Sequence, residues 1–421
     1  MGGESSLTLK KDHNRSLEPI YDLDHKEGLS GGCKSMPSIT SFEIAGLAGR
    51  QGVVRHSLEP DVNVFWGPNG SGKTSMLKIL HSALQDEAST LVRVRFDWAV
   101  VRIEVRGRTI ERRIRNPKAK NVNIEPTETL FDDYELHDRQ VGERLINRAE
   151  KMRWSTKPSD LDDQIFRHSY LSILRLSDSP RMRVGSTADI LDEVAYDRMF
   201  ARQIQAIWQD YNTRELMQIR RAQQNGLAAV AGSVITRSIS PRKKRSTLAD
   251  IDVEAAYFAV KAFFQDQNLH PRVGDYQSFS ENFLTNELMR EVVAEIVEVQ
   301  KEVESAQEPK RAVERLIHEL FRGRMKVDFE GRFLKIKQGS DEVPLEALSS
   351  GQKQVMRLLV ECLAAGPNCV IVDEPEISMH VDWQHRLVNA MRTINPKAQL
   401  ILATHSPEIM ADLQDRMIHE L

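Results

Sequence analysis

The strongest constraint on this chain is the string Gly67-Pro68-Asn69-Gly70-Ser71-Gly72-Lys73-Thr74, which fills the pattern G-x-x-x-x-G-K-[ST] at every fixed position. A short apolar run rich in β-formers, Val62–Trp66, precedes it, and apolar residues recur at helical spacing after it. The string is therefore expected to join a buried strand to the N-terminus of a helix. Its three glycines let backbone N–H groups point at phosphate oxygens, and the helix dipole adds partial positive charge there.

This P-loop pattern predicts a site for a nucleoside triphosphate and Mg²⁺. Lys73 can reach the β- and γ-phosphates, and the Thr74 hydroxyl can take one position on Mg²⁺. The residues expected to contact the phosphates are Gly67, Pro68, Asn69, Gly70, Ser71, Gly72, Lys73, Thr74 and Ser75.

Composition describes an ordinary globular protein. The chain has 421 residues, of which 40% are apolar and 28% charged, with a net charge of −3. No global basic field indicates a nucleic-acid partner, although a local basic surface is compatible with this charge. The three cysteines form no C-x-x-C pair, which indicates a reducing cytoplasm and neither a disulfide framework nor a zinc site. No run approaches the ~18 apolar residues of a membrane span, so we expect a cytoplasmic protein with no membrane partner.

Hydrophobic patterning predicts four segments. Residues 1–36 are polar and are expected to form a disordered leader; residues 37–186 carry the P-loop and a run of strands. Residues 187–321 have long helical periodicity and are expected to form an α-helical insertion. Residues 322–421 begin with a strand hairpin, Met325–Phe329 and Arg332–Ile336, and return to strands and helices of the first type.

An antiparallel β-meander is predicted after the P-loop helix from the segments Leu91–Phe96, Trp98–Val105 and Thr109–Ile114. Its basic residues are Arg106, Arg108, Arg112, Arg113, Arg115, Lys118 and Lys120. One interpretation is a contact surface for a nucleic-acid backbone. The other, favoured because no aromatic residues are interleaved for stacking, is a solvated face protected by charge against edge pairing.

A second coincidence lies in the helical insertion. Arg311 and His318 are seven residues apart, so they can share one face of a helix, as in a small RNase site. A lone pair in a charged helix more often has a structural role, and that interpretation is the one favoured.

Three further strings carry chemistry. Leu348-Ser349-Ser350-Gly351-Gln352 precedes a predicted helix, and hydroxyl and N–H groups at a helix N-terminus suit a γ-phosphate, although the same string also suits an ordinary helix cap. A buried run, Cys369–Val372, ends in Asp373 and Glu374, a Walker B arrangement in which Asp373 holds Mg²⁺ and Glu374 orients or deprotonates the attacking water. A last buried run, Gln399–Thr404, ends at His405, whose imidazole can hydrogen-bond the γ-phosphate.

Together these strings resemble the ABC-type ATPases, and among them the RecF/SMC/OLD-like branch of prokaryotic AAA-labelled ATPases. The strings are Gly67–Thr74, Leu348–Gln352, Val370–Glu376 and Ala403–Pro407; residues 374–380 also resemble the D-loop of that branch. The resemblance implies an α/β P-loop NTPase fold of ABC type with a β-meander subdomain. It also implies a Q-loop glutamine, for which Gln140 and Gln164 both lie in the right interval.

The family implies a mechanism and a set of roles. ATP with Mg²⁺ is bound and hydrolysed, with Glu374, His405 and Lys73 as catalytic residues and Thr74 and Asp373 as metal ligands. Two subunits pair head-to-tail in a homodimer, or in a higher even-numbered oligomer, with each ATP between one P-loop and the partner's signature. The signature residues, which would act in trans, are Ser349, Ser350, Gly351 and Gln352.

The resemblance also suggests a cellular role. OLD-type proteins carry a nuclease domain after the ATPase, and this chain, ending at Leu421, is expected to have none. It is therefore expected to act as the sensor or scaffold that controls a separately encoded effector, a nuclease, in anti-phage defence of retron, Septu or PARIS type. The alternative is a RecF-like DNA-binding ATPase in DNA repair. A transporter's nucleotide-binding subunit is disfavoured by the large helical insertion.

Overall fold

The computed structural model describes residues 37–117, 152–158, 165–171, 193–236, 252–266, 274–329 and 333–421. Met36–Leu421 form one compact unit by their contacts. The leader predicted for residues 1–36 lies outside the described residues, and the four-segment division of the chain stays a prediction. Among the described helices, none is both long and apolar enough to cross a membrane.

A five-stranded parallel sheet forms the centre of the protein, in the order β13-β3-β12-β11-β7. Its strands are nearly continuous apolar runs because a parallel sheet is covered on both faces. The strands are β3 (Val62–Trp66), β7 (His168–Leu171), β11 (Cys369–Asp373), β12 (Leu400–Thr404) and β13 (Ile418–Glu420).

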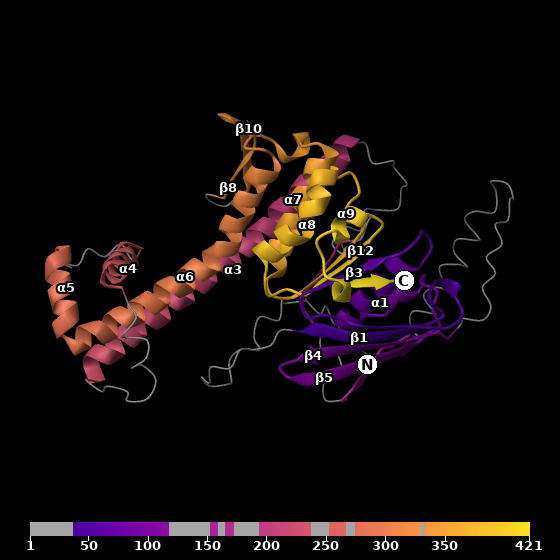
Figure 1. Ribbon diagram of the computed structural model, residues 1–421, viewed down its shortest axis with the longest axis horizontal. Helices are drawn as coiled ribbons and strands as arrows, with labels where there is room; N and C mark the ends of the chain where they lie inside the picture. Colours follow the sequence, from indigo (N-terminus) through magenta and orange to yellow (C-terminus); the bar gives the residue numbers. More distant parts are fainter. Residues whose placement is uncertain are drawn as a thin grey trace, which may run out of the picture. The chain divides into compact units, whose positions relative to one another are not determined.

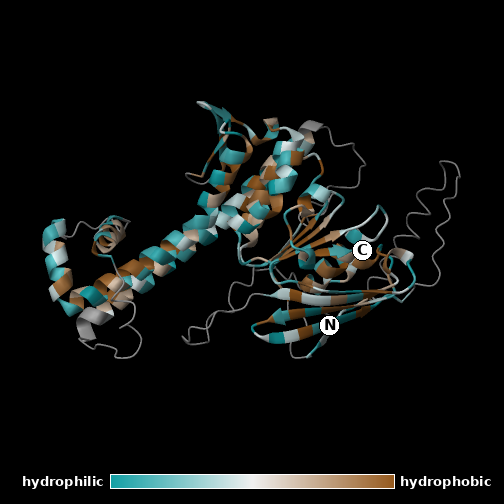
Figure 2. Ribbon diagram, viewed as in Figure 1, coloured by the Kyte–Doolittle hydropathy of each residue, from teal (hydrophilic) through white to brown (hydrophobic). Residues whose placement is uncertain are grey.

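The two faces of this sheet belong to two hydrophobic cores. In β11, Cys369 and Ile371 pack on the side of α1 (Lys73–Gln85), whereas Val370 and Val372 pack on the side of α7 (Ser350–Ala365) and α8 (Val381–Ile394). Alternate residues of a strand point to opposite faces, so one short run supplies both cores. Figure 2 shows the hydrophobic residues gathered on these central strands and on α1.

A second, antiparallel sheet packs on the other side of α1, with the order β2-β1-β4-β5-β6. Figure 1 shows α1 between this sheet and the parallel strands. The strands are β1 (Ser38–Ala45), β2 (Val53–Ser57), β4 (Trp98–Val105), β5 (Arg108–Arg115) and β6 (Ser155–Lys157), with a short 3-10 turn η1 (Leu47–Gly49) between β1 and β2. The predicted class, an α/β P-loop fold with an antiparallel subdomain, is confirmed.

The prediction of a strand over Leu91–Phe96 is wrong. The segment begins in the 3-10 turn η2 (Ser89–Leu91) and then runs without strand pairing, although Leu91, Val94 and Phe96 are buried in the core around α1. The reason is that β4, the next strand in the chain, already pairs with β1 on one side and with β5 on the other. Neither side of β4 is therefore open to pairing with residues 91–96. The rest of the meander, β4 and β5, pairs antiparallel as predicted.

The basic character assigned to β5 also needs a correction at Arg112. Its side chain is fully buried, at 0% exposure, rather than solvated. In β5, Arg112 shares the inward face with Ile110 and Ile114, where its guanidinium donates to Ala83 O at the end of α1 and lies 3.6 Å from Asp86 Oδ2. It therefore holds the C-terminal end of the P-loop helix against the sheet. Lys118 and Lys120 lie outside the described residues.

The helical segment consists of α3 (Glu193–Thr236), α4 (Val253–Asp266), α5 (Tyr276–Thr285) and α6 (Glu287–Leu320). α3 and α6 lie side by side, and α4 and α5 pack with them in a separate core. The chain continues into a small antiparallel sheet of β8 (Lys326–Asp328), β9 (Lys335–Gln338) and β10 (Asp341–Val343), which confirms the predicted hairpin. The remaining short elements are η4 (Leu345–Ala347), α9 (Pro407–Met410) and η5 (Asp415–Met417).

Candidate functional site

Strand register brings three of the four motif strings together. Thr404 at the end of β12 pairs with Trp66 at the end of β3, and Asp373 at the end of β11 pairs with Ala403. The residues that follow these parallel strands therefore leave the sheet at one edge, which is where ligands bind in open α/β sheets. The P-loop, Glu374 and His405 all lie there.

The loop before α1 has the geometry expected of a phosphate cradle. Gly70 and Gly72 have φ values of +80° and +98°, a region that other residues rarely adopt. The Ser71 hydroxyl between them is buried and has no hydrogen-bond partner in the part of the chain that the structure describes. A buried, unpaired hydroxyl at a helix N-terminus fits a phosphate oxygen as its partner.

Lys73 connects the loop to His405. Its Nζ donates to Gly67 O at 2.8 Å and lies 2.8 Å from His405 Nε2. Burial lowers the pKa of the Lys73 ammonium, and the nearby carboxylates, with Glu374 first, offset part of that effect. A loop carbonyl and an imidazole nitrogen thus hold the ammonium at the position where the phosphates would bind.

Glu374 is the third member of this contact chain. Its Oε1 lies 3.2 Å from His405 Nε2. A single ring nitrogen cannot accept a hydrogen bond from Lys73 and donate one to Glu374 at the same time, so the tautomer of the ring decides which of the two contacts is a hydrogen bond. The backbone of Glu374 has φ +46°, a left-handed conformation that costs a non-glycine residue of order 1–3 kcal/mol. This strained turn places the carboxylate at the strand edge immediately after Asp373.

Asp373 has the properties of a cation ligand. Its side chain is 2% exposed, and neither carboxylate oxygen has a hydrogen-bond partner of good geometry among the described residues. Burial raises the pKa of Asp373 to about 6, while the nearby Thr74 hydroxyl acts in the opposite direction. A buried carboxylate without partners is costly unless a cation or ordered water completes its shell. Asp373 and Thr74 therefore fit Mg²⁺ as its protein ligands.

No group of three or more His, Cys, Asp or Glu residues within the described ranges could hold a metal by itself.

Sequence reasoning did not assign a role to Glu376. Its Oε1 accepts hydrogen bonds from Thr404 Oγ1 at 2.8 Å, from His405 N at 2.6 Å and from Ser406 N at 3.2 Å. The only signal in the sequence is a second carboxylate two residues after Glu374, and nothing local shows that it reaches the next strand.

The signature string caps α7. The Ser349 hydroxyl accepts from Gln352 N and the Gln352 side chain accepts from Ser349 N, which forms a capping box. A Cβ at Gly351 would lie 2.5 Å from Ser378 O, so only glycine fits this close approach. Within the described part of the chain, no hydrogen bond joins residues 349–352 to the P-loop. The structure thus places the other three strings at one edge of the sheet. The signature instead packs against the turn that contains Ser378.

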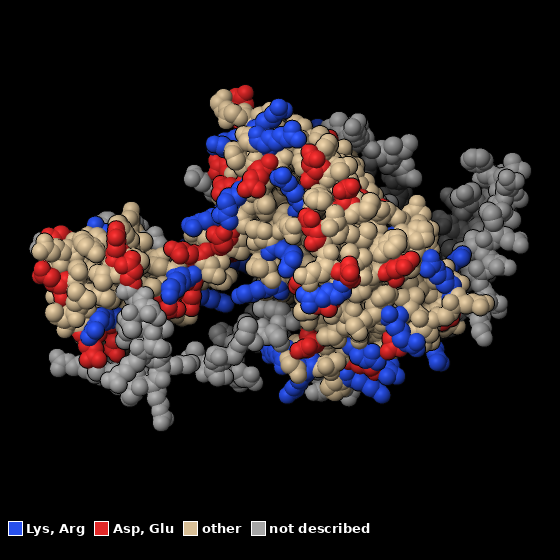
Figure 3. Space-filling view, in the orientation of Figure 1, with Lys and Arg blue, Asp and Glu red and all other residues tan. Residues whose placement is uncertain are grey.

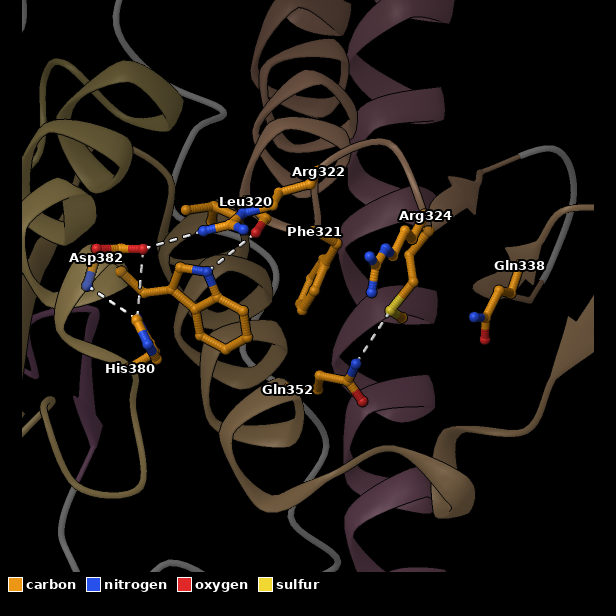
Figure 4. Close-up of a pocket in the computed structure, with 10 residues that line it drawn as sticks. Leu320, Phe321, Arg322, Arg324, Gln338, Gln352, His380 and Asp382 are labelled. Atoms are coloured by element: carbon orange, nitrogen blue, oxygen red, sulfur yellow. Dashed lines mark hydrogen bonds and ion pairs between the residues drawn. The ribbon is translucent and has the colours of Figure 1, made fainter.

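A pocket of about 450 Å³, referred to below as the Arg324 pocket, lies beside the signature residue Gln352 (Figure 4). Residues at the first turns of α7 and α8, Gln352, His380 and Asp382, line one part of it, and Arg322 and Arg324 line another. Arg322 Nη2 lies 3.3 Å from Asp382 Oδ2, whereas no ion pair of Arg324 is found among the described residues. Figure 4 shows the Arg324 guanidinium directed to the same space as the Gln352 side chain.

Two other sequence candidates remain without support. Gln140 and Gln164, the Q-loop candidates, lie outside the described residues. Arg311 and His318 are both exposed on α6, and the Arg311 guanidinium donates to Gln307 Oε1 at 2.8 Å. Within the described structure no contact joins Arg311 to His318, so the geometry gives no site of RNase type.

Comparison with known proteins finds sequence similarity to a protein family and to a curated protein. The family described as "AAA domain, putative AbiEii toxin, Type IV TA system" matches residues 236–411. A protein of Vibrio cholerae serotype O1 biovar El Tor, "Retron Vc95 probable ATPase", is 30% identical over 102 residues, which are 20% of this chain and 20% of that protein. The chain therefore matches about a fifth of the length of this curated relative.

Solved SMC head domains show a distant structural likeness. The head domain of Thermotoga maritima SMC has a TM-score of 0.39 and 11% identity, covering 91% of this chain and 94% of that one. The Pyrococcus furiosus Smc head, bound to the C-terminal domain of ScpA, has a TM-score of 0.38 and 14% identity, covering 89% and 92%.

Proposed function

We propose that this chain, an ABC-type ATPase of the RecF/SMC/OLD-like branch, binds and hydrolyses ATP as a dimeric switch. The observation that supports this most strongly is the convergence of Lys73, Asp373, Glu374 and His405 at the carboxyl ends of three adjacent parallel strands. They are the groups needed for phosphate binding, cation binding, water activation and recognition of the γ-phosphate.

The proposed chemistry assigns one task to each residue. Lys73 exchanges its hydrogen bond with Gly67 O for the β- and γ-phosphates, and Asp373 and Thr74 hold Mg²⁺, which supplies charge neutralisation when bound. Glu374 orients the attacking water and accepts its proton. His405, freed from Lys73, donates to the γ-phosphate.

Dimerisation completes the site in this proposal. Gly351 lies close to Ser378 in the turn after β11, and Gln352 lines the pocket that contains Arg324. No hydrogen bond joins residues 349–352 to their own P-loop among the described residues. A signature that faces away from the nucleotide of its own subunit is available to the nucleotide of a second one, as in a head-to-tail two-fold dimer. The face that carries the signature and the Arg324 pocket is then the dimer face.

The helical segment is suited to transmit closure of such a dimer. α3 contacts both ends of the signature helix α7. Near the N-terminus of α7, Lys353 Nζ lies 2.6 Å from Asp197 Oδ1 of α3. At its C-terminus, Ala364 O accepts hydrogen bonds from Arg214 of α3 at 3.0 and 3.1 Å. Because the two ties lie at opposite ends of α7, a rotation of that helix moves α3 with it. We propose that ATP binding thereby changes the position of the helices α3–α6.

Charge reversal at Arg324 tests the proposed dimer face. We expect Arg324→Glu to weaken ATP-dependent dimerisation by about tenfold or more, because a carboxylate beside the signature would repel the partner's triphosphate at close range. Binding of ATP to the monomer should be unchanged, since Arg324 does not contact the P-loop in the described structure. Sedimentation or light scattering with Mg·ATP measures the first quantity and nucleotide titration the second.

Arg311→Glu is the matched control, because Arg311 is also exposed, on α6, but lies outside the pocket. Equal dimerisation of Arg324→Glu and wild type would show that this face does not form the dimer.

We further propose that the switch controls a separately encoded effector, a nuclease, in anti-phage defence. Support comes from the similarity to the retron ATPase of Vibrio cholerae and from the family match whose description names a type IV toxin–antitoxin system. Both similarities cover part of the chain, and neither description names a separate effector, so control of an effector is our own inference.

Purification from the native host with Mg·ATP tests this role. The Glu374→Gln protein, which we expect to retain ATP, should recover a stoichiometric second protein that mass spectrometry identifies as a nuclease. The Lys73→Ala protein is the matched control, because it should not bind ATP and should recover much less of the partner. DNA recovered without a protein partner would contradict the effector role and favour the repair-type function.

A RecF-like DNA-binding ATPase is the second candidate. Figure 3 shows Lys and Arg side chains gathered over the antiparallel sheet, with Asp and Glu among them. Three arginines of the antiparallel sheet, Arg55, Arg102 and Arg113, form ion pairs across or along the strands with Glu43 or Glu111. Such pairing lowers the local positive charge, so the observation supports the solvated-face interpretation more than a phosphate contact. Strong stimulation of ATP hydrolysis by duplex DNA, lost at high salt, would favour this candidate instead.

A further inference from the structure

We propose that Glu376 is a positioning residue, whose carboxylate fixes the backbone of His405 and so places the imidazole against the nucleotide. This inference rests on the proposed ATPase function and names a residue that the motif analysis left without a role. Glu376 does not contact the phosphate cradle itself. It acts through His405.

The evidence is that one carboxylate oxygen of Glu376 accepts three hydrogen bonds. Glu376 Oε1 accepts from Thr404 Oγ1 at 2.8 Å, His405 N at 2.6 Å and Ser406 N at 3.2 Å. Ser406 N also donates to Thr404 Oγ1 at 2.9 Å, which closes the group into a single network. Hydrogen bonds to an ionised carboxylate are shorter and stronger than neutral ones, so this oxygen fixes two successive peptide units.

His405 is the first residue after β12, so the sheet no longer fixes its backbone and another group must do so. Thr404 is fully buried and held by the sheet, whereas His405 has left it and its N–H has no strand partner. Glu376 supplies the acceptor that the sheet no longer provides. The imidazole can then reach Lys73 Nζ at 2.8 Å and Glu374 Oε1 at 3.2 Å.

Glu376 also couples two loops. It belongs to the turn after β11, two residues past Glu374, and it binds the loop after β12. Gln384 of α8 ties the same two loops from the other side, since its Nε2 donates to Met379 O at 2.9 Å and its Oε1 accepts from Ser406 Oγ at 2.7 Å. The two ties make the loop that carries Glu374 and the loop that carries His405 move as one body.

A carboxylate is better suited here than a neutral acceptor. Its negative charge acts on Lys73 and opposes the lowering of the pKa of that ammonium by burial. Its second oxygen, Oε2, is buried and has no hydrogen-bond partner among the described residues. Glu376→Gln would therefore keep the Oε1 acceptor but bury an amide without an acceptor at the Oε2 position.

The experiment compares Glu376→Ala and Glu376→Gln with wild type in steady-state ATPase assays and in titrations with a fluorescent ATP analogue. We expect Glu376→Ala to lower kcat by about 10- to 100-fold, since a shift of about 1 Å in a catalytic group has that scale. KM for ATP and the dissociation constant of the analogue should change by less than about threefold, because the P-loop is intact. Glu376→Gln keeps the Oε1 acceptor but buries an unpaired amide and removes the charge, so it should recover only part of the lost rate.

A double-mutant cycle with His405→Ala separates positioning from a general loss of stability. If Glu376 acts through His405, Glu376→Ala should cost less than about threefold in kcat when His405 is already absent. Equal factors in both backgrounds would overturn the proposal, because they indicate an effect independent of His405. Melting temperatures show whether the variants fold.

Two controls complete the test. Glu408→Ala removes a glutamate of α9, which follows His405 in the chain; its side chain makes no contact with His405 among the described residues, so kcat should be unchanged. His405→Ala alone separates the two claims: if it lowers kcat while Glu376→Ala does not, only the positioning role is overturned. If His405→Ala has no effect, the assignment of His405 in the proposed function fails first.

Discussion

Replacing Glu374 by glutamine is expected to lower the ATP turnover of this protein by about 10²- to 10⁴-fold, the contribution typical of a general base. The amide has the shape of the carboxylate, so the contact with the His405 ring and the left-handed turn at Glu374 should persist. It cannot accept the proton of the attacking water. Binding of Mg·ATP should therefore be retained while hydrolysis stops.

The same variant should trap the closed state. If hydrolysis opens the dimer, Glu374→Gln with Mg·ATP should elute as a stable dimer, whereas wild type should return to monomer as ATP is consumed. Light scattering coupled to size exclusion measures the mass, and phosphate release measures turnover. Glu346→Gln, at an exposed glutamate in η4, is the matched control. Equal phosphate release by Glu374→Gln and wild type would refute the assignment of the base.

Replacing Lys73 by alanine is the second large effect that we expect. Lys73 is buried, and its ammonium has a carbonyl, an imidazole and three carboxylates around it, so the triphosphate replaces neutral partners with charged ones. Each hydrogen bond from a charged group is worth about 1.5–3 kcal/mol. Two of them lost correspond to a weakening of ATP binding by roughly 10²- to 10⁴-fold.

Isothermal titration with Mg·ATP checks this result. Lys301→Ala removes an exposed lysine of α6 that is paired with Glu298, and should leave ATP affinity unchanged. A dissociation constant of Lys73→Ala within about threefold of wild type would place the triphosphate elsewhere, whatever the outcome at Glu374.

The structure brings together residues that the sequence predicted as a phosphate and cation site, and the reason is local. In the P-loop string the glycines, Lys73 and the flanking strand and helix are adjacent in the chain, so one window contains the whole cradle. The same holds for Asp373 and Glu374, which end a buried run. Short-range patterns such as these need no knowledge of which strands are neighbours.

Other features were missed because they depend on distant partners. Leu91–Phe96 has the alternation of a strand, but β1, from the beginning of the described chain, occupies the edge that it would need. Arg112 has the composition of a solvated face, yet its register turns it inward against α1. Glu376 looks like one more acidic residue of a loop until β12 brings His405 beside it.

The sequence by itself predicted a nucleoside triphosphate site and the residues that would form its P-loop and Walker B parts, because those residues lie close together in the chain. Only the tertiary structure decided that β12 lies between β3 and β11, that Glu376 reaches His405, and that the signature helix adjoins a pocket with Arg324 rather than its own P-loop. Strand order depends on how complete faces of the sheet are buried by α1, α7 and α8, and no local window contains that information.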